Sequence, residues 1–369
     1  MKLPTTVLFW GFIFCLVFVT HLAAQDDDFK PLFNGKNLDG WQRVNTDEST
    51  WSVKDGMLLC TGKPIGELRT TRMYQNFILE VEWRHMKPKG NAGIFVWADD
   101  ITAPGVPFHR SIEVQVLENE YGNTRGHTTH GDIFPIHGAK MKPVNGRGGN
   151  RAFPTENRSK PSPEWNQYRI ECIEGEISLA VNGKVVTQGQ NCIPRKGYIC
   201  LESEGGVVHY RNLRIKELDD TEVDEQLVAI ADRGFRCLYT GIDLEGWESE
   251  GEWKSQDWRI VHSTETNGTL STAITDDSVG FICDLKTKEE STPTVYWRGT
   301  PIKIPLRKNK WCRVEGQQKG NRLIVSLNDG RQLPPVPLEA GNSLKIESEG
   351  AIEVANVYVR PDTTKRQNE

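Results

Sequence analysis

The sequence predicts an all-β protein made of two antiparallel β-sandwiches in tandem. Turn residues recur roughly every 8–12 positions, which is typical of short antiparallel strands. Apolar and polar residues alternate between these turns, and helical periodicity is nearly absent. Two motifs also occur twice: residues 33–41 (FNGKNLDGW) return as 239–247 (YTGIDLEGW), and 201–205 (LESEG) return as 346–350 (IESEG). A chain of 369 residues is long enough for two domains.

Five segments are predicted as strands because each alternates apolar with polar side chains: 77–84, 111–116, 168–172, 177–181 and 207–215. Between the fourth strand and the residues that follow it, Asn182-Gly183 is the strongest short-range signal for a tight hairpin turn. Residues 222–233 carry apolar side chains at roughly helical spacing, so they form either a short linker helix or an irregular connection.

The second copy of the repeat is shorter than the first. The first motif pair is offset by 206 residues and the second pair by 145, so the second copy lacks 61 residues. Matching tryptophans bracket the whole deficit, namely Trp51 and Trp165 in the first copy and Trp258 and Trp311 in the second. We therefore expect the strands from Arg69 to Val116 and the loop 118–163 to be unique to the first copy, and the chemistry to lie there.

These observations predict five segments: a signal peptide at 1–24, a full-length sandwich with the site at 29–218, a linker at 219–234, a reduced sandwich at 235–361 and a tail at 362–369. The signal peptide follows from Lys2, the apolar run 7–19 and the small residues of Leu22-Ala23-Ala24. Thirteen apolar residues are short for a bilayer span, although a short membrane anchor is the alternative. The protein is thus expected to be secreted or periplasmic, with no stable membrane insertion after cleavage.

Charge and cysteine content limit the partners. A formal net charge of −5 argues against nucleic acid, which requires concentrated Lys and Arg. Seven of the eight cysteines follow the signal peptide, and their odd number leaves at least one thiol free. Cys192 and Cys200 flank a turn and could pair, or most of the cysteines are small buried hydrophobic residues.

The unique segment contains a glycine-rich turn and a strand with two polar side chains. Residues 90–93 (GNAG) precede an apolar strand and indicate a close backbone approach, either to a neighbour or to a ligand contacted by Asn91; the alternative, which we favour, is a tight turn that enters a core strand. Glu113 and Gln115 share one face of their strand. Polar groups on a central strand are costly unless they line a groove, so we favour a groove over the solvent face of an edge strand.

Five of the eight histidines fall between His85 and His137. His130 and Asp132 combine an imidazole with a carboxylate and are candidate ligands of a divalent metal, although no motif requires a cofactor. The alternative is that such histidines are loop surface or hydrogen-bonded supports. Trp97 lies in the unique segment and is a candidate for stacking on a sugar ring. Six other tryptophans recur at matched positions and are expected in the frame of the fold: Trp41, Trp51, Trp165, Trp247, Trp258 and Trp311.

Residues 29–218 resemble the 3-keto-disaccharide hydrolase family, also called 3-keto-glucoside lyase/hydratase. The resemblance is carried by five motifs in order: 33–41, 90–94, 113–117, 164–169 and 210–215. Residues 235–361 are similar to a reduced member without the GNAG and Glu-x-Gln signatures. The resemblance implies concanavalin A-like jelly-roll sandwiches, a carbohydrate or oxidised glycoside as substrate, and secretion by bacteria that degrade carbohydrate.

The family resemblance also implies a chemistry. A 3-keto group acidifies the C2 proton of the sugar, a base removes that proton, the enolate expels the C1 leaving group, and water then adds. Glu113 is the expected base and Gln115 is expected to orient the sugar. The enolate is expected to be stabilised by Arg84, by Lys140 or by a metal held by His130 and Asp132. His137 or His109 is expected to supply the proton for the leaving group. The residues expected to contact the substrate are Asn91, Trp97, Arg84 and His109.

Two other functions stay open. Jelly-roll glucanases carry Glu-x-Asp-x-x-Glu, and this chain has Glu113-x-Gln115-x-x-Glu118, so a retaining glycosidase is one alternative. Gln115 removes the carboxylate that usually assists the nucleophile. The other alternative is a non-catalytic carbohydrate-binding or scaffolding module.

Overall fold

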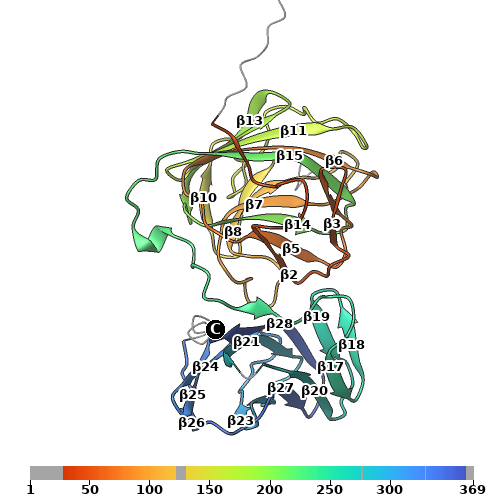
Figure 1. The fold of residues 1–369 in the computed structure, drawn as a ribbon, viewed down its shortest axis with the longest axis vertical. Helices are drawn as coiled ribbons and strands as arrows, with labels where there is room; N and C mark the ends of the chain where they lie inside the picture. The colour runs from red at the N-terminus through yellow and green to blue at the C-terminus, as the bar shows by residue number, and fades with distance from the viewer. Residues whose placement is uncertain (1–27, 122–129, 276, 329, 363–369) are drawn as a thin grey trace, which may run out of the picture.

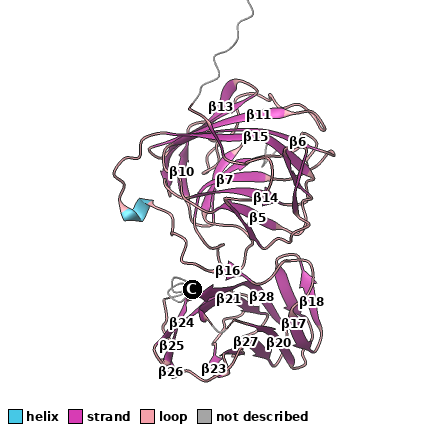
Figure 2. Cartoon of the chain, viewed as in Figure 1, coloured by secondary structure: helices cyan, strands magenta, loops and turns pink. Residues whose placement is uncertain are grey.

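The computed structural model describes residues 28–121, 130–275, 277–328 and 330–362, and almost all of its regular structure is β-strand (Figures 1 and 2). The described residues contain one helix, the single 3-10 turn η1 (Glu225–Leu227). The chain forms two lobes, with β1 to β15 in the first and β16 to β28 in the second. The all-β prediction is therefore confirmed. Among these residues no helix has the length and apolar character needed to cross a membrane.

The first lobe consists of two antiparallel sheets packed on one hydrophobic core. In the nine-stranded sheet the order is β10-β13-β12-β11-β6-β15-β4-β3, with β1 paired to β15. Its strands are β1 (Lys30–Pro31), β3 (Trp51–Lys54), β4 (Met57–Cys60), β6 (Phe77–His85), β10 (Lys140–Pro143), β11 (Asn166–Ile173), β12 (Glu176–Val181), β13 (Lys184–Ile193) and β15 (Val208–Glu217). The six-stranded sheet has the order β2-β5-β14-β7-β8-β9. Its strands are β2 (Trp41–Val44), β5 (Gly66–Thr70), β7 (Gly93–Ala98), β8 (Ser111–Gln115), β9 (Ile133–Ile136) and β14 (Tyr198–Ser203).

The strands expected in the first lobe are present where the alternation placed them. β6, β8, β11, β12 and β15 cover the five predicted segments to within two residues at each end. The Asn182-Gly183 turn joins β12 to β13 with φ values of 47° and 85°, the left-handed conformation that favours Asn and Gly. Cys192 and Cys200 do not form a disulfide. Cys192 and Cys200 lie on strands of different sheets, so the pairing considered for them is wrong.

The second lobe repeats the two-sheet arrangement. Its eight-stranded sheet has the order β18-β19-β28-β21-β24-β25-β26, with β16 paired to β28, and its five-stranded sheet has the order β17-β20-β27-β22-β23. The strands are β16 (Arg236–Cys237), β17 (Trp247–Glu250), β18 (Trp253–Gln256), β19 (Arg259–His262), β20 (Gly268–Ala273), β21 (Ser278–Thr287), β22 (Thr294–Trp297), β23 (Thr300–Lys303), β24 (Cys312–Lys319), β25 (Arg322–Leu327), β26 (Val336–Pro337), β27 (Ser343–Ser348) and β28 (Ile352–Pro361).

The strand order corrects one expectation from the repeat. β17-β20-β27-β22-β23 follows the same path as β2-β5-β14-β7-β8, so β23 stands where β8 stands in the first lobe. The expectation that β7 and β8 belong to the first lobe alone is therefore wrong. The segments joining the strands are shorter in the second lobe: β22 and β23 are separated by two residues, whereas β7 and β8 are separated by twelve.

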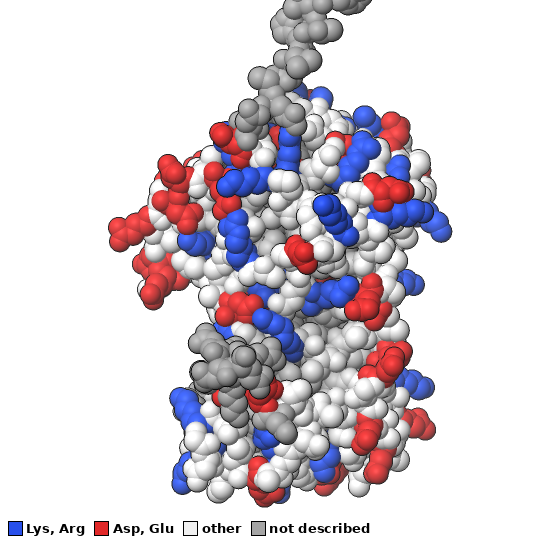
Figure 3. Space-filling model, in the orientation of Figure 1, with Lys and Arg blue, Asp and Glu red and all other residues white. Residues whose placement is uncertain are grey.

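Acidic and basic side chains are interspersed over the described part of the face seen in Figure 3. Acidic residues gather where the linker carries η1, and those of residues 219–225 are exposed. Such a mixed surface presents no extended field of one sign on this face.

Candidate active site on the six-stranded sheet

The outer face of the six-stranded sheet carries a row of acidic and amide side chains on adjacent strands. Ile94, Val114 and Leu201 point into the core of the first lobe. Their neighbours in sequence point to the opposite face because side chains alternate along a strand. On that face Glu202 of β14 lies between Glu67 of β5 and Gly93 of β7, and Gly93 in turn pairs with Gln115 of β8.

Glu113 and Glu202 meet above Gly93. A Cβ atom at Gly93 would lie 3.0 Å from Glu113 Oε1, 3.0 Å from Glu202 Oε2 and 3.1 Å from the Phe95 ring. Only glycine leaves this space free for the two carboxyl groups. The glycine at the end of the glycine-rich segment therefore allows two side chains to approach each other closely over the strand. The sequence alone did not show whether a neighbouring group or a ligand makes this approach.

Two amide side chains border the carboxyl groups. Gln115 Nε2 donates to Asn91 Oδ1 at 3.0 Å and, at 3.4 Å, to the carbonyl of Ala92. Asn91 Nδ2 donates to Glu204 at the end of β14. The structure thus brings together Asn91, Glu113 and Gln115 of the predicted site, on one face.

Burial raises the pKa of Glu113, Glu202 and Glu204. It raises the pKa of Glu113 to about 8, with the charge of Glu204 as the next cause. The pKa of Glu202 is raised well above its ordinary value by burial and then by Glu113, and a hydrogen bond to Glu204 also favours its protonated form. Burial also raises the pKa of Glu204, although the same hydrogen bond opposes that rise. Glu202 is thus held in its protonated form more firmly than Glu113.

Arg151 supplies the positive charge beside the carboxyl groups. It lowers the pKa of Glu113, which opposes part of the effect of burial. Its Nη1 donates to Asp132 Oδ2 at 2.9 Å, and its guanidinium lies 3.4 Å above the Phe134 ring on β9. A guanidinium held by a buried carboxylate is suited to stabilise negative charge that develops on a bound substrate.

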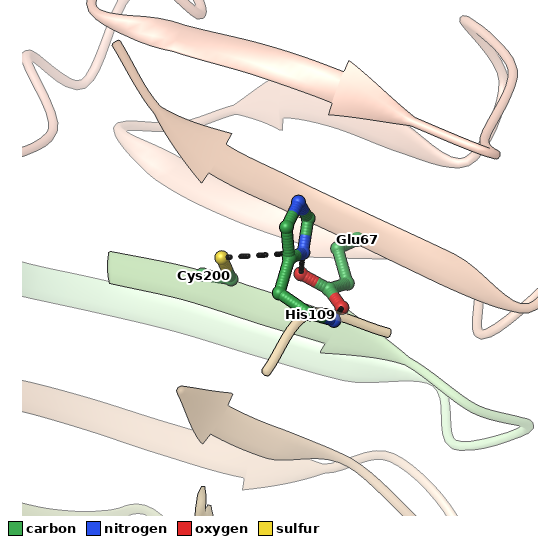
Figure 4. A group of neighbouring side chains, drawn as sticks. All are labelled: Glu67, His109 and Cys200. Atoms are coloured by element: carbon green, nitrogen blue, oxygen red, sulfur yellow. Dashed lines mark hydrogen bonds and ion pairs between the residues drawn. The ribbon is translucent and has the colours of Figure 1, made fainter. Parts of the chain in front are cut away.

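A second polar cluster lies further along the same face (Figure 4). Glu67 accepts from the backbone N–H of His109 at 3.0 Å and from its ring Nδ1 at 2.5 Å, and Cys200 Sγ is 3.9 Å from that ring nitrogen. All three residues are buried, and their donor atoms lie within 4.8 Å of one another, so this group could hold a metal ion. Here Glu67 already bonds His109 twice, whereas Nε2 of the ring has no partner among the described residues.

The two predicted metal ligands, His130 and Asp132, each bond another side chain. His130 Nδ1 bonds Ser159 Oγ at 2.6 Å, and burial lowers the pKa of this histidine to about 4. Asp132 instead pairs with Arg151. His130 therefore fits the alternative considered for it, a hydrogen-bonded support, and His127 of the same loop lies outside the described residues.

Three other predicted site residues lie away from Glu113 and Glu202, namely Trp97, Arg84 and Lys140, and a fourth, His109, is bound to Glu67. Trp97 is fully buried in the core and donates from Nε1 to the Gln75 carbonyl at 2.9 Å, so it cannot stack on a sugar. Arg84 points from β6 to the outer face of the other sheet, where it lies 4.5 Å above the Trp165 ring. Lys140 is exposed at the start of β10 in that same sheet. His109 is fully buried against Glu67, so it cannot contact substrate as expected.

His137, the predicted acid, is exposed in the turn after β9 and stacks on Phe108 with ring centres 6.5 Å apart. The register places Phe134 opposite Glu113, so His137 lies three residues further along β9 and its turn. The proton donor nearest to Glu113 is therefore Glu202, a residue that sequence reasoning missed.

Glu67, Arg151, Glu202 and Glu204 were all absent from the predicted site. The signal for two of them was present in the LESEG motif, where two glutamates alternate along a strand as Glu113 and Gln115 do. The motif recurs in the second copy, whereas the site was expected in the segment unique to the first copy, so these glutamates were not among the predicted site residues. Neither Glu67 nor Arg151 has a comparable signal, because their neighbours come from strands distant in sequence.

The second lobe retains one glutamate of the acidic row and pairs it with a lysine. By register, Pro301 and Lys303 stand where Glu113 and Gln115 stand, and Glu347 takes the place of Glu202. Glu347 accepts from Lys345 Nζ at 2.6 Å and from Tyr296 Oη at 2.7 Å, and these bonds lower its pKa. The same strand position thus holds a carboxylic acid in the first lobe and a carboxylate in the second.

Comparison with known proteins identifies the family of the first lobe. The family model described as the 3-keto-alpha-glucoside-1,2-lyase-like domain matches residues 28–216, just over half of the chain. A protein named 3-keto-disaccharide hydrolase from Bacteroides thetaiotaomicron is 25% identical over 254 residues, which is 54% of this chain and 81% of that protein.

Among solved structures, a candidate glycosyl hydrolase from Parabacteroides distasonis is similar at 22% identity with a TM-score of 0.42, covering 53% of this chain and 98% of its own. A Bacillus licheniformis β-glucanase is similar at 14% identity with a TM-score of 0.34, covering 52% of this chain and 97% of its own. The family match spans the first lobe, including Gly93, Glu113 and Glu202. The chain belongs to the 3-keto-alpha-glucoside-1,2-lyase-like domain family and is a carbohydrate-active, hydrolase-like protein.

Proposed function

We propose that the first lobe cleaves glycosidic bonds of 3-keto-glycosides by elimination followed by hydration. The observation that carries this proposal is the meeting of Glu113 and Glu202 above Gly93, with the pKa of both carboxyl groups raised. A base whose pKa lies near 8 is matched to a C–H bond that an adjacent ketone has acidified. A neighbouring carboxyl group that keeps its proton is matched to an oxygen leaving group.

In the proposed reaction Glu113 removes the proton from C2, and the electron pair forms the enolate of the 3-keto group. Arg151 stabilises the negative charge on the enolate oxygen. The C1–O bond then breaks with formation of a C1–C2 double bond, and Glu202 gives its proton to the departing oxygen. Addition of water across that double bond restores the 3-keto sugar, so the net reaction is hydrolysis. Asn91 and Gln115 are placed to hold sugar hydroxyl groups.

The retaining glycosidase is less well supported by these residues. In the Glu113-x-Gln115-x-x-Glu118 pattern the proton donor would be Glu118. Burial raises the pKa of Glu118, but hydrogen bonds from the backbone N–H groups of Glu120, Lys89 and Ser162 outweigh it and lower this pKa, so Glu118 is held as a carboxylate and is not suited to donate a proton. A non-catalytic carbohydrate-binding module would leave the buried, proton-holding pair without a purpose.

Proton NMR of the purified protein in D2O, with 4-nitrophenyl 3-keto-glucoside and with the unoxidised glucoside, tests the proposal. We expect deuterium at C2 and release of the phenol from the keto substrate alone. The Glu113→Gln variant should lose both signals, whereas Glu347→Gln at the matched position of the second lobe should lose neither. Cleavage of the unoxidised glucoside alone would establish the glycosidase, and binding of both sugars without turnover would establish the binding module.

Export is also proposed, from the apolar run and cleavage site at the N-terminus. Sequencing of the N-terminus of the mature protein should begin at Gln25, and a start at Met1 would contradict the proposal.

A further inference from the structure

The loop between β7 and β8, residues 99–110, belongs to the first lobe and contacts the second lobe. It leaves the six-stranded sheet of the first lobe and lies against β28 of the second lobe. Asn356 of β28 donates from Nδ2 to the carbonyls of Ala103 at 3.0 Å and Val106 at 2.9 Å. Two residues further along β28, Tyr358 Oη is 2.9 Å from Thr102 Oγ1. We call residues 99–110 the bridging loop.

Asp284 of β21 anchors the same loop from beside Asn356. Its Oδ2 accepts from the backbone N–H of Gly105 at 2.8 Å and from Asn356 Nδ2 at 2.7 Å. Arg313 holds the carboxylate with two further bonds, at 2.7 and 2.8 Å. Asp284 is fully buried, and a buried carboxylate is costly unless hydrogen-bond and charged partners surround it, as these do.

Two tryptophans of the second lobe contact Gly105 at the tip of the bridging loop. Trp258 Nε1 donates to the Gly105 carbonyl at 3.2 Å. A Cβ atom at Gly105 would lie 2.2 Å from the Trp311 ring, and the φ of this glycine is +74°. Trp258 and Trp311 were expected only as frame residues, whereas they contact the bridging loop of the first lobe.

The other end of the bridging loop is built into the candidate active site. Glu67 binds both the backbone and the ring of His109, and the Phe108 ring packs edge-on against Phe95 with centres 5.7 Å apart. Arg110 closes the base of the loop through two bonds to Asp99, at 2.7 and 2.8 Å. β8 begins at the next residue, and Glu113 is four residues after His109.

We propose that the second lobe positions the catalytic strand of the first: Asn356 and Asp284 are positioning residues that fix the bridging loop, and through it His109 and the carboxyl group of Glu113. A loop of twelve residues without such anchors would sample many conformations. Catalytic groups require support that holds them to within a fraction of an ångström. The effect of this positioning on catalysis rests on the proposed function. The tautomer of the His109 ring reports the positioning of the loop independently of catalysis.

The test compares two glycine substitutions in the full chain. Gly105→Ala forces a Cβ against Trp311, whereas Gly183→Ala has a similar φ of +85° and no atom within 4 Å of the added carbon. Both variants add a Cβ at a glycine of similar positive φ, and only the first disturbs the contact between the lobes. Asn356→Gly is the second test variant: glycine suits the φ of +49° at that position, and the change removes the side chain with its bonds to the bridging loop, to Asp284 and to Asn45. Three readouts follow: amide hydrogen exchange of 99–115, the ¹⁵N shifts of the His109 ring, and kcat and KM for the keto substrate with their pH profile.

We expect Gly105→Ala and Asn356→Gly to speed exchange in the bridging loop at least 10-fold, to mix the His109 tautomers, and to lower kcat at least 10-fold with little change in KM. Gly183→Ala should match the wild type in all three. A variant with a mobile loop and mixed tautomers but an unchanged kcat and pH profile would overturn the positioning role while the proposed function stands. Unchanged exchange and tautomers in both variants would overturn the anchoring itself. A wild type without turnover would refute the proposed function and leave the His109 readout to decide the anchoring.

Discussion

Glu113 Oε1 and Glu202 Oε2 each lie 3.0 Å from the point where a side chain at Gly93 would begin. Two carboxyl groups this close and this buried cannot both ionise without strong mutual repulsion. The pair therefore holds at least one proton over the neutral range, and the structure favours Glu202 as its carrier. This single relationship places an acid and a base on β14 and β8, the two strands that flank β7 and its Gly93.

Glu202→Gln should slow cleavage according to the leaving group. With an alkyl leaving group, loss of the general acid should lower kcat by roughly 10²–10⁴-fold, because the departing oxygen needs a proton. With 4-nitrophenolate, which leaves without one, kcat should fall far less. The measurement is kcat for both substrates in each variant, with Glu347→Gln as the matched control. Equal losses on the two substrates would contradict the acid role.

The stability of the protein should fall between pH 4.5 and pH 8 because of Glu113. Its pKa is 4.5 when unperturbed and about 8 in the folded chain, so over this range the unfolded state loses a proton that the folded state keeps. The free energy of unfolding then falls by about 1.4 kcal/mol for each pH unit over this window, as an upper estimate for one group. Urea unfolding at several pH values should show a flatter dependence for Glu113→Gln than for the wild type.

Glu347→Gln provides the control of opposite sign for that experiment. The pKa of Glu347 is lowered in the folded state, so its contribution to stability is present above its unfolded pKa and is lost as the pH falls. Removing it should weaken the protein slightly at neutral pH and should not change the loss of stability toward pH 8. The same flattening in both variants would count against a raised pKa at Glu113.

Arg151→Leu should move the pH profile of activity. The guanidinium lowers the pKa of Glu113, so its removal should raise that pKa and shift the limb of kcat/KM that reports the base to higher pH. It should also lower kcat, since the enolate loses its stabilising charge. Arg147→Leu is the control, because the Arg147 guanidinium lies over the Phe153 ring, 4.1 Å from its centre. A profile that moves equally in the two variants would contradict the assignment of Arg151.

Trp97→Ala should act on folding and not on sugar contact. Trp97 is fully buried, and its loss should cost about 3–5 kcal/mol of unfolding free energy. Whatever fraction stays folded should bind the keto substrate with an unchanged KM. Trp165→Ala, on the outer face of the other sheet beneath Arg84 and Arg211, should cost much less. A raised KM in the folded fraction of Trp97→Ala would instead show that this ring contacts the sugar.

The local pattern was sufficient for much of the fold. Alternation along 77–84 and 111–116 predicted β6 and β8, and Asn182-Gly183 predicted the hairpin turn, because both signals depend on residues adjacent in the chain. It also placed Glu113 and Gln115 together on a polar face. The same alternation does not say which sheet a strand joins. Arg84 and Glu113 were therefore assigned to one site although they lie on the outer faces of opposite sheets.

The sequence by itself determined the strands, the turns, the family and one member of the carboxyl pair. Tertiary structure decided the partners: Glu202 beside Glu113, Arg151 beside Asp132, and Glu67 around His109. The reason is physical. A strand fixes the direction of its own side chains, whereas a pKa and a close contact depend on which distant strand pairs beside it, and that register is set only when the sheet forms around its core.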